Sequence, residues 1–328
     1  LRSLPPEGEL SALRAAGRTL LMALQSAAEI RALIAQHKRW DIVFGVIGSV
    51  CLAICLMTFA TLFVDMLIDG YARLRPEFFT EFPSRRAGQA GILSAWIGTT
   101  MVMIITAVVA VPLGVAAGIY LEEYAPSNWM TDVIEINISN LAGVPSIVYG
   151  LLALGLFVYQ FGLGQSVATA GLTLALLILP VVIVATREAI RAIPGAIREA
   201  AYALGATKWQ VVQGHILPYS TGGILTGVII GMARAIGETA PIITVGALTF
   251  IAFLPPSPVT TEPPFLSFEW LMSPFTVMPI QIFNWTSRPD PAFHQNAAAA
   301  SFVLVLMTLG MNGLAIWLRY RLRKNIKW

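Results

Sequence analysis

The chain has 328 residues, of which 56% are hydrophobic and only 12% are charged. A soluble globular domain carries about 25% charged residues, so this composition, with a mean hydropathy of +0.73, excludes that class and indicates an integral membrane protein. The formal net charge of +3 does not indicate a nucleic-acid partner, because the basic residues lie beside apolar runs, where the preference for basic cytoplasmic loops accounts for them.

Residues 1–40 form an arm that has no continuous apolar stretch, which excludes a secretory signal peptide. Leucines recur in the arm at roughly helical spacing, at positions 10, 13, 20, 21 and 24. Two interpretations stay open: an amphipathic helix that lies on the membrane surface, or a helix solvated in the cytoplasm. We expect the transmembrane domain to cover residues 41–328.

Six apolar segments follow, each long enough to provide the roughly 20 residues that cross a bilayer core. We therefore predict an all-α integral membrane protein with six transmembrane helices. Cys51 and Cys55 lie in the first segment, and we interpret both as small buried hydrophobes because their spacing gives no disulfide framework and no metal site. The segments cover residues 42–68, 91–120, 138–162, 166–187, 222–252 and 298–318.

The distribution of Lys and Arg predicts the orientation in the membrane. Six lie in the N-terminal arm, four in 187–208 and five in the tail 319–328, whereas five lie in the loops on the other side. Both termini are therefore expected in the cytoplasm, with a cytoplasmic loop at about 188–221 and a long periplasmic loop at about 253–297. Prolines exclude a continuous helix in the long loop, and its stretch 274–285 is expected to be interfacial or re-entrant.

Glu122 and Glu123 follow the second apolar segment. Adjacent side chains point to different faces of a helix, so a catalytic pair of carboxylates is not expected. Either the two acids solvate a helix end, or they contact a basic patch on a cytoplasmic partner.

The run EAAYALGATKWQVVQGHILP (199–218) interrupts the apolar sequence between the fourth and fifth segments. Ala and Leu favour a helix over 199–204, Gly205 turns the chain, and a second short helix fits 207–216. Pro218 is expected where the chain re-enters the bilayer. An ordinary cytoplasmic hairpin would not need the small residues at 200, 201, 203 and 206, which permit close approach of a partner surface.

The fifth segment contains Arg234, the one Lys or Arg that we expect well within a span. Such a charge costs about 2.5–3.5 kcal/mol on insertion scales and should have a partner, and Glu238 lies one helical turn further on the same face. A structural ion pair explains both residues, and so does a site where an anion competes with Glu238 for the guanidinium. Gly237 and Pro241 would permit a local break that exposes the amide of Thr239.

Several runs of the sequence are similar to one transporter family. Glu-Ala-Ala at 199–201, Gly205 and the HILP run that ends at Pro218 resemble the EAA loop of ABC-importer permeases. The runs at 114–125, 141–157, 233–241 and 274–285 resemble PstA-type permeases of phosphate-specific importers. The resemblance covers about residues 90–320.

The resemblance implies a type I ABC-importer permease bundle in the bacterial inner membrane, which carries half of a phosphate pathway. In this family the EAA loop forms a coupling helix that seats in a groove of the ATP-hydrolysing subunit. The resemblance places Arg234, Glu238 and Thr239 in the substrate pathway. The residues expected to serve coupling are Glu199, Ala200, Ala201, Gly205 and Pro218.

The implied partners are a homologous PstC-like permease, two PstB-like ATP-binding subunits and a PstS-like phosphate-binding protein outside. The sequence contains no Walker GxxxxGK[ST] run and no nucleophile elbow. We therefore expect no catalytic residue and no cofactor in this chain, with ATP and Mg on the partner ATPases. A permease for sulfate or molybdate, and a non-transporting component that signals phosphate status, stay open as alternatives.

Overall fold

The structure, a computed structural model, describes residues 7–259, 265 and 267–323, with the side chains of 7–37, 39, 322 and 323 outside that description. The chain divides into two compact units, Leu1–Asp65 and Met66–Trp328. Each unit is described by itself below.

The described part of the first unit lies within one long helix, α1 (Glu7–Gly70). The helix passes residue 40 without a break, so the expected limit between arm and membrane domain is not a limit of secondary structure. The predicted amphipathic face of residues 1–40 falls on side chains outside the described residues. Cys51 and Cys55 are exposed, and the prediction that both are buried is wrong, because no other element of their own unit covers this helix.

The number of spans agrees with the prediction, but one span is bent. Five stretches of the described residues are long and apolar enough to cross a membrane, and a sixth results if the helix pair Trp129–Leu141 and Ser146–Gln160, bent by 106°, counts as one. Pro145 lies in this bend, and its ring disfavours a helical conformation of the residue before it. The five unbroken stretches are Trp40–Arg73, Leu93–Tyr124, Val167–Arg191, Lys208–Ile236 and Pro291–Arg321.

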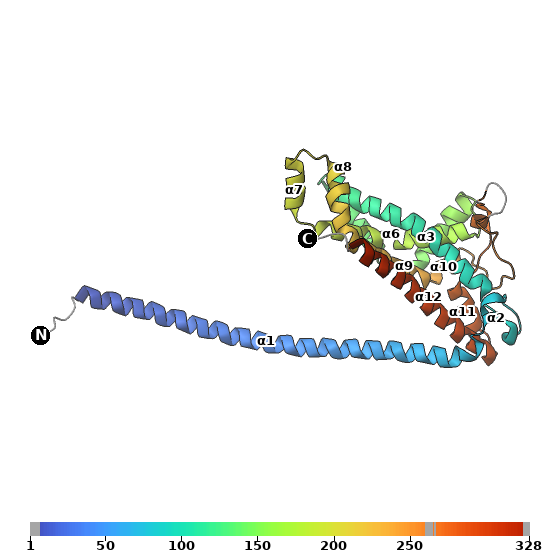
Figure 1. Ribbon diagram of the computed structural model, residues 1–328, viewed down its shortest axis with the longest axis horizontal. Helices are drawn as coiled ribbons and strands as arrows, with labels where there is room; N and C mark the ends of the chain where they lie inside the picture. The colour runs from blue at the N-terminus through green and yellow to red at the C-terminus, as the bar shows by residue number, and fades with distance from the viewer. Residues whose placement is uncertain (1–6, 260–264, 266, 324–328) are drawn as a thin grey trace. The chain divides into compact units, whose positions relative to one another are not determined.

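The described part of the second unit is built from helices joined by turns and, between α10 and η6, by a longer segment. Figure 1 labels most of them. In chain order they are η1 (Tyr71–Arg73), α2 (Pro76–Thr80), η2 (Ala87–Gln89), α3 (Leu93–Ile119), η3 (Tyr120–Tyr124), α4 (Trp129–Leu141), α5 (Ser146–Ala153), η4 (Leu154–Gln160), α6 (Val167–Arg191), α7 (Gly195–Ala203), α8 (Lys208–Val211), η5 (Val212–Ile216), α9 (Leu217–Ile236), α10 (Ala240–Thr244), η6 (Glu269–Met272), α11 (Met278–Thr286) and α12 (Pro291–Arg323).

The fifth span lies earlier in the chain than predicted. Instead of 222–252, the continuous helical stretch is Lys208–Ile236, and the second arm of the expected hairpin is the beginning of this span. Val211, Val212 and Ile216 are buried in it, so this segment has the apolar side chains that a packed helix needs. Pro218 lies in the first turn of α9, directly after the π-helical turn η5, so the helical stretch continues through it.

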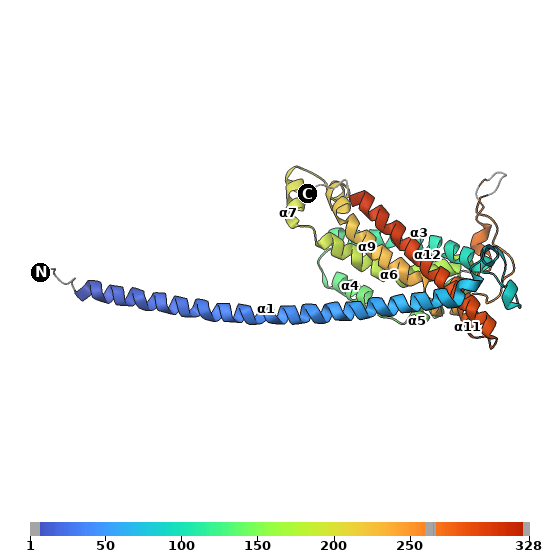
Figure 2. The ribbon, with the colours of Figure 1, turned by 60° about the horizontal axis from the view of Figure 1, so that its bottom comes forward.

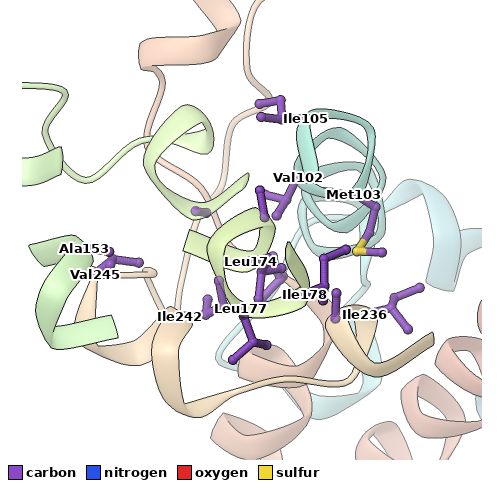
Figure 3. Packing of buried hydrophobic residues seen from close by; sticks show 14 of the residues in the cluster. Val102, Met103, Ile105, Ala153, Leu174, Leu177, Ile178, Ile236, Ile242 and Val245 are labelled. Carbon is purple, nitrogen blue, oxygen red and sulfur yellow. The ribbon is translucent and has the colours of Figure 1, made fainter. Parts of the chain in front are cut away.

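The core of the second unit surrounds α6, which packs along both α3 and α9. Figure 3 shows Leu174, Leu177 and Ile178 of α6 between side chains of α3 and side chains of α9 and α10. Val102 of α3 and Ile242 of α10 are among the buried residues that pack in this core. Since α6 is the most buried of the candidate spans, it provides the frame on which the neighbouring helices are placed.

The segment that was expected to be interfacial or re-entrant packs into the bundle. α11 (Met278–Thr286) lies against α12, as Figure 1 and Figure 2 show. Its Met278, Ile280 and Trp285 are buried, and the Met278 amide donates a hydrogen bond to Thr99 Oγ1 of α3 at 2.8 Å. This excludes a segment that lies free on the membrane surface, and the last long helix begins at Pro291 rather than at residue 298.

Candidate functional site

The turn after α7 has the geometry that its sequence predicts. Gly205 has a φ of +83°, in the left-handed region that glycine adopts without strain. Its amide donates to the Tyr202 carbonyl at 2.9 Å, and the Ala206 amide donates to the Ala201 carbonyl at 3.1 Å. This pair of bonds is a Schellman ending, so Gly205 ends the helix at a defined residue.

α7 presents a small-residue surface beyond the end of the bundle, next to α8 (Figure 1). Glu199, Ala200 and Gly205 are exposed, as predicted for residues that meet a partner. Ala201 is only 6% exposed and packs inward, and Pro218 is half-buried, so neither belongs to this surface. The expected contact with an ATPase therefore depends on the first three residues.

One exposed side chain of this surface was not singled out from the sequence. Leu204 is 90% exposed, although it stands next to the glycine turn and is apolar. A single exposed apolar side chain is ordinary at a protein surface, so Leu204 is of interest only because it lies beside Glu199, Ala200 and Gly205. Its position directly before Gly205 is the sequence signal that would have identified it.

An ion pair joins α7 to the end of α3. Arg198 of α7 donates to Glu123 Oε1 from Nε at 2.9 Å and from Nη2 at 2.8 Å. The Glu123 side chain is 8% exposed and that of Arg198 21%, so solvent screens the pair little. Glu123 lies in η3, the π-helical turn that continues α3.

The neighbouring acid pairs with α6 instead. Arg191 donates to Glu122 in a bidentate manner, with Nε···Oε1 at 3.0 Å and Nη2···Oε2 at 2.9 Å. Arg187 Nε lies 3.5 Å from Glu122 Oε2, and Arg187 Nη2 contacts Glu135 Oε1 of α4. The cluster therefore holds the ends of α3, α4 and α6 together.

The interpretation of Glu122 and Glu123 as a solvated helix end is wrong, because both acids pair with arginines of this chain. Contact with a basic patch on a cytoplasmic partner stays a prediction. The signal was present in the charges of two loops on the same side. Residues 121–137 contain four acids and no Lys or Arg, whereas 187–208 contain four Lys or Arg.

Arg234 and Glu238 lie at a helix break. Arg234 is in the last turn of α9, which ends at Ile236, and α10 begins at Ala240. Arg234 Nε donates to Glu238 Oε1 at 3.3 Å. Because the fifth span is shifted, Arg234 lies near its end rather than well within it, and its side chain is 39% exposed.

The break leaves polar groups without partners. Among the described residues, Nη1 and Nη2 of Arg234 have no hydrogen-bond partner, nor have the amide and hydroxyl of Thr239. The Thr244 hydroxyl, by contrast, donates to the Pro241 carbonyl of its own helix at 2.8 Å. The local opening that Gly237 and Pro241 would permit is therefore present, with a guanidinium, an amide and a hydroxyl beside it.

The comparisons with known proteins identify the family. The family described as binding-protein-dependent transport system inner membrane component matches residues 110–328. The chain belongs to this family. The matched region of this inner-membrane transport component begins within α3 and contains α7, the arginine–glutamate cluster and the break at Arg234.

Curated relatives of this transport component are similar over most of their length. The probable ABC transporter permease protein YqgI of Bacillus subtilis is 32% identical over 86% of this chain and 95% of its own. The phosphate transport system permease protein PstA of Mycobacterium leprae is 32% identical over 74% of this chain and 76% of its own, and that of Yersinia pestis is 33% identical over 76% and 78%.

A solved structure shares the fold of this family member. The chain is 14% identical to a bacterial ABC transporter involved in the import of the acidic polysaccharide alginate, with a TM-score of 0.56 over 83% of this chain and 95% of that one. The likeness shows a type I importer permease bundle, in agreement with the predicted fold class.

Proposed function

We propose that this chain is the permease subunit of an ATP-driven phosphate importer in the bacterial inner membrane. It forms half of the pathway beside a homologous PstC-like permease, and it works with two PstB-like ATPases and a PstS-like phosphate-binding protein. The observation that carries the proposal is the similarity to permeases named for phosphate transport over about three quarters of the chain.

The coupling role is supported by the surface of α7. Glu199, Ala200, Leu204 and Gly205 are exposed together at one end of the bundle, where an ATPase groove would receive them. This requires α7 and both termini to lie in the cytoplasm, in agreement with the distribution of Lys and Arg. The ATP and Mg sites belong to the partner subunits, and this chain is not itself an enzyme.

The anion role is supported by the break between α9 and α10. A transported phosphate needs a cation and hydrogen-bond donors, and Arg234 offers two free Nη groups whose planar fork matches phosphate oxygens. Glu238 occupies Nε, so its charge keeps an anion from binding too tightly to leave. Thr239 adds an amide and a hydroxyl without partners in the described part of the chain.

The test is the uptake of labelled phosphate by cells that lack their own permease and contain the partner subunits. The parent chain should restore uptake, Arg234→Ala should abolish it, and Arg234→Lys should keep a fraction because the charge remains without the fork. The matched control is Arg319→Ala, since Arg319 lies in α12 and donates to Thr226 of α9 at 2.8 Å, away from the break.

Different results contradict different parts of the proposal. Normal uptake by Arg234→Ala at matched membrane levels would reduce Arg234 and Glu238 to a structural ion pair. Failure of the parent chain would overturn phosphate as the substrate, and uptake of sulfate and molybdate would then be measured. A chain that restores phosphate signalling but no uptake would be the non-transporting component.

A further inference from the structure

Arg198 joins three elements that meet at the exposed end of the bundle. Besides its two hydrogen bonds to Glu123, it donates to the carbonyls of Ile193 and Ile190 at 3.0 and 3.1 Å. Those carbonyls lie at the end of α6, where the helix dipole favours a cation. The guanidinium therefore contacts the end of α6, the end of α3 and its own helix α7.

Glu123 provides the connection between α7 and α3. Among the described residues, its pair with Arg198 is the only polar contact between α7 and the π-helical turn η3. Lys208, at the start of α8, adds a longer contact to the Glu123 carbonyl at 3.4 Å. A displacement of α7 would thus reach α3 through this mostly buried ion pair, which lies beside an apolar cluster that contains Ala201 of α7 and Ile119 of α3.

The end of α3 is built so that it can follow such a displacement. Pro112 lies inside the helix and removes one backbone hydrogen bond, which permits bending there. Beyond it, Gly114 and Gly118 face Val182 and Thr186 of α6 so closely that a Cβ atom would collide with them. The two glycines therefore let this segment of α3 lie directly against α6, and its freedom to move comes from the bend at Pro112.

The adjacent acid limits the movement from the other side. Glu122 holds the same turn to Arg191 and Arg187 of α6, and α6 is the most buried candidate span. Glu122 therefore connects η3 to α6, and Glu123 connects η3 to α7, the helix with the exposed surface.

We propose that the Glu123–Arg198 ion pair transmits the movement of α7 to the segment of α3 beyond Pro112, so that ATP hydrolysis by the partner subunits changes the pathway. Glu123 and Arg198 are positioning residues that contact neither ATP nor the anion. The inference rests on the proposed function, because it takes α7 as the element that the ATPases move.

The test uses the complete transporter, purified with its ATPases and second permease, placed in lipid vesicles and supplied with the binding protein. Phosphate uptake and ATP hydrolysis are measured on the same vesicles. Glu123→Gln should keep ATP hydrolysis but lower the phosphate transported per ATP about tenfold, within the usual range of coupling between two sites. A merely structural role would lower both rates together and leave their ratio unchanged.

The matched control is Glu188→Gln. Glu188 is an acid of α6 whose side chain is 66% exposed and lies 3.7 Å from Arg191 within the same helix, so it joins no two elements. The substitution removes the same charge on the same side of the bundle, and the ratio should equal that of the parent.

A covalent link replaces the ion pair in a second variant, Glu123→Cys with Arg198→Cys, in a chain whose Cys51 and Cys55 are changed to Ser. This variant should be uncoupled, and a flexible thiol-to-thiol crosslinker of side-chain length should restore the ratio without restoring any charge. The rescue shows that the connection itself is needed.

The outcomes separate the two proposals. If the parent transports phosphate and Glu123→Gln keeps the parental ratio, or if crosslinking leaves the ratio low, the transmission role is overturned while the proposed function stands. If the parent hydrolyses ATP but transports no phosphate, the proposed function fails, and this inference fails with it.

Discussion

Replacing Arg187 with glutamine should destabilise the bundle more than the same change at Arg191, although both guanidinium groups contact Glu122. The Arg187 side chain is 7% exposed and that of Arg191 51%. Removing one partner of a buried ion pair typically costs about 3–5 kcal/mol, whereas an exposed pair contributes about 1 kcal/mol or less. Burial therefore decides the difference between two otherwise similar arginines.

The contacts of Arg187 place the loss of stability expected for Arg187→Gln near the lower limit of the range for a buried ion pair. Its Nε and Nη2 lie within ion-pair distance of Glu122 and Glu135 but lack well-aligned hydrogen bonds, and Arg191 would still neutralise Glu122 in the variant. We expect a loss of about 3 kcal/mol for Arg187→Gln and about 1 kcal/mol for Arg191→Gln.

The assay is thermal unfolding of the purified chain in detergent, at low salt and at 1 M salt. Added salt should reduce the effect of Arg191→Gln, because exposed charges are screened, and should leave most of the effect of Arg187→Gln. Equal losses for the two variants, or a loss at Arg187 that disappears in 1 M salt, would refute the assignment of the stability to a buried pair.

Three further changes test the packing, the turn and the orientation. Gly150→Ala would place a Cβ against Thr244 and the backbone of α10, so it should cost about 1–3 kcal/mol in thermal unfolding, whereas Gly155→Ala has open space and should cost little. Gly205→Ala forces a side chain into the left-handed region, at about 1–2 kcal/mol; amide hydrogen exchange in α7 should accelerate and ATP-driven uptake should fall. Glu199→Cys, in a chain without its native cysteines, should react with a membrane-impermeant thiol reagent in inverted vesicles and not in intact cells; the opposite result would reverse the proposed orientation.

The sequence predicts the elements of this fold where composition and local geometry act together. Long apolar runs identify α3, α6 and α12, because a helix that crosses a membrane must satisfy its own backbone. Gly205 predicts the end of α7 for an equally local reason, since no other residue adopts its φ without strain.

The sequence does not predict the limits of the fifth span, because the decisive contacts are tertiary. Residues 208–216 are mixed in polarity, and their apolar face matters only because α6 and α7 cover Val211 and Ile216. At the other end, the apolar residues after Gly237 continue the hydropathy signal, while the chain itself breaks and packs α10 against α5. Hydropathy therefore indicates which residues are buried, but a buried segment of a bundle does not have to be one continuous helix.

The arginine–glutamate cluster was missed for a related reason. Each charge taken alone fits a solvated helix end. Only a comparison of residues 121–137 with residues 187–208 shows that the acids of one stretch complement the basic residues of the other. Adjacent acids on a helix turn point in different directions, which lets Glu122 contact α6 while Glu123 contacts α7. The divergence of these two side chains argues against a catalytic pair, and the same divergence lets the single turn η3 join α6 and α7.

The distance between the two candidate regions explains why such a junction would be needed. Lys208 and Arg234 belong to one helical stretch, and at 1.5 Å per residue they are about 39 Å apart along it. Under the proposed coupling, a displacement of α7 would reach the break at Arg234 along this stretch, which contains the π-helical turn η5, and it would reach α3 through Glu123. Because α3 and α9 both pack against α6, transmission through both routes would shift the two helices relative to that common frame. A change in that relative position alters the space between them, which a shift of the whole bundle would not do.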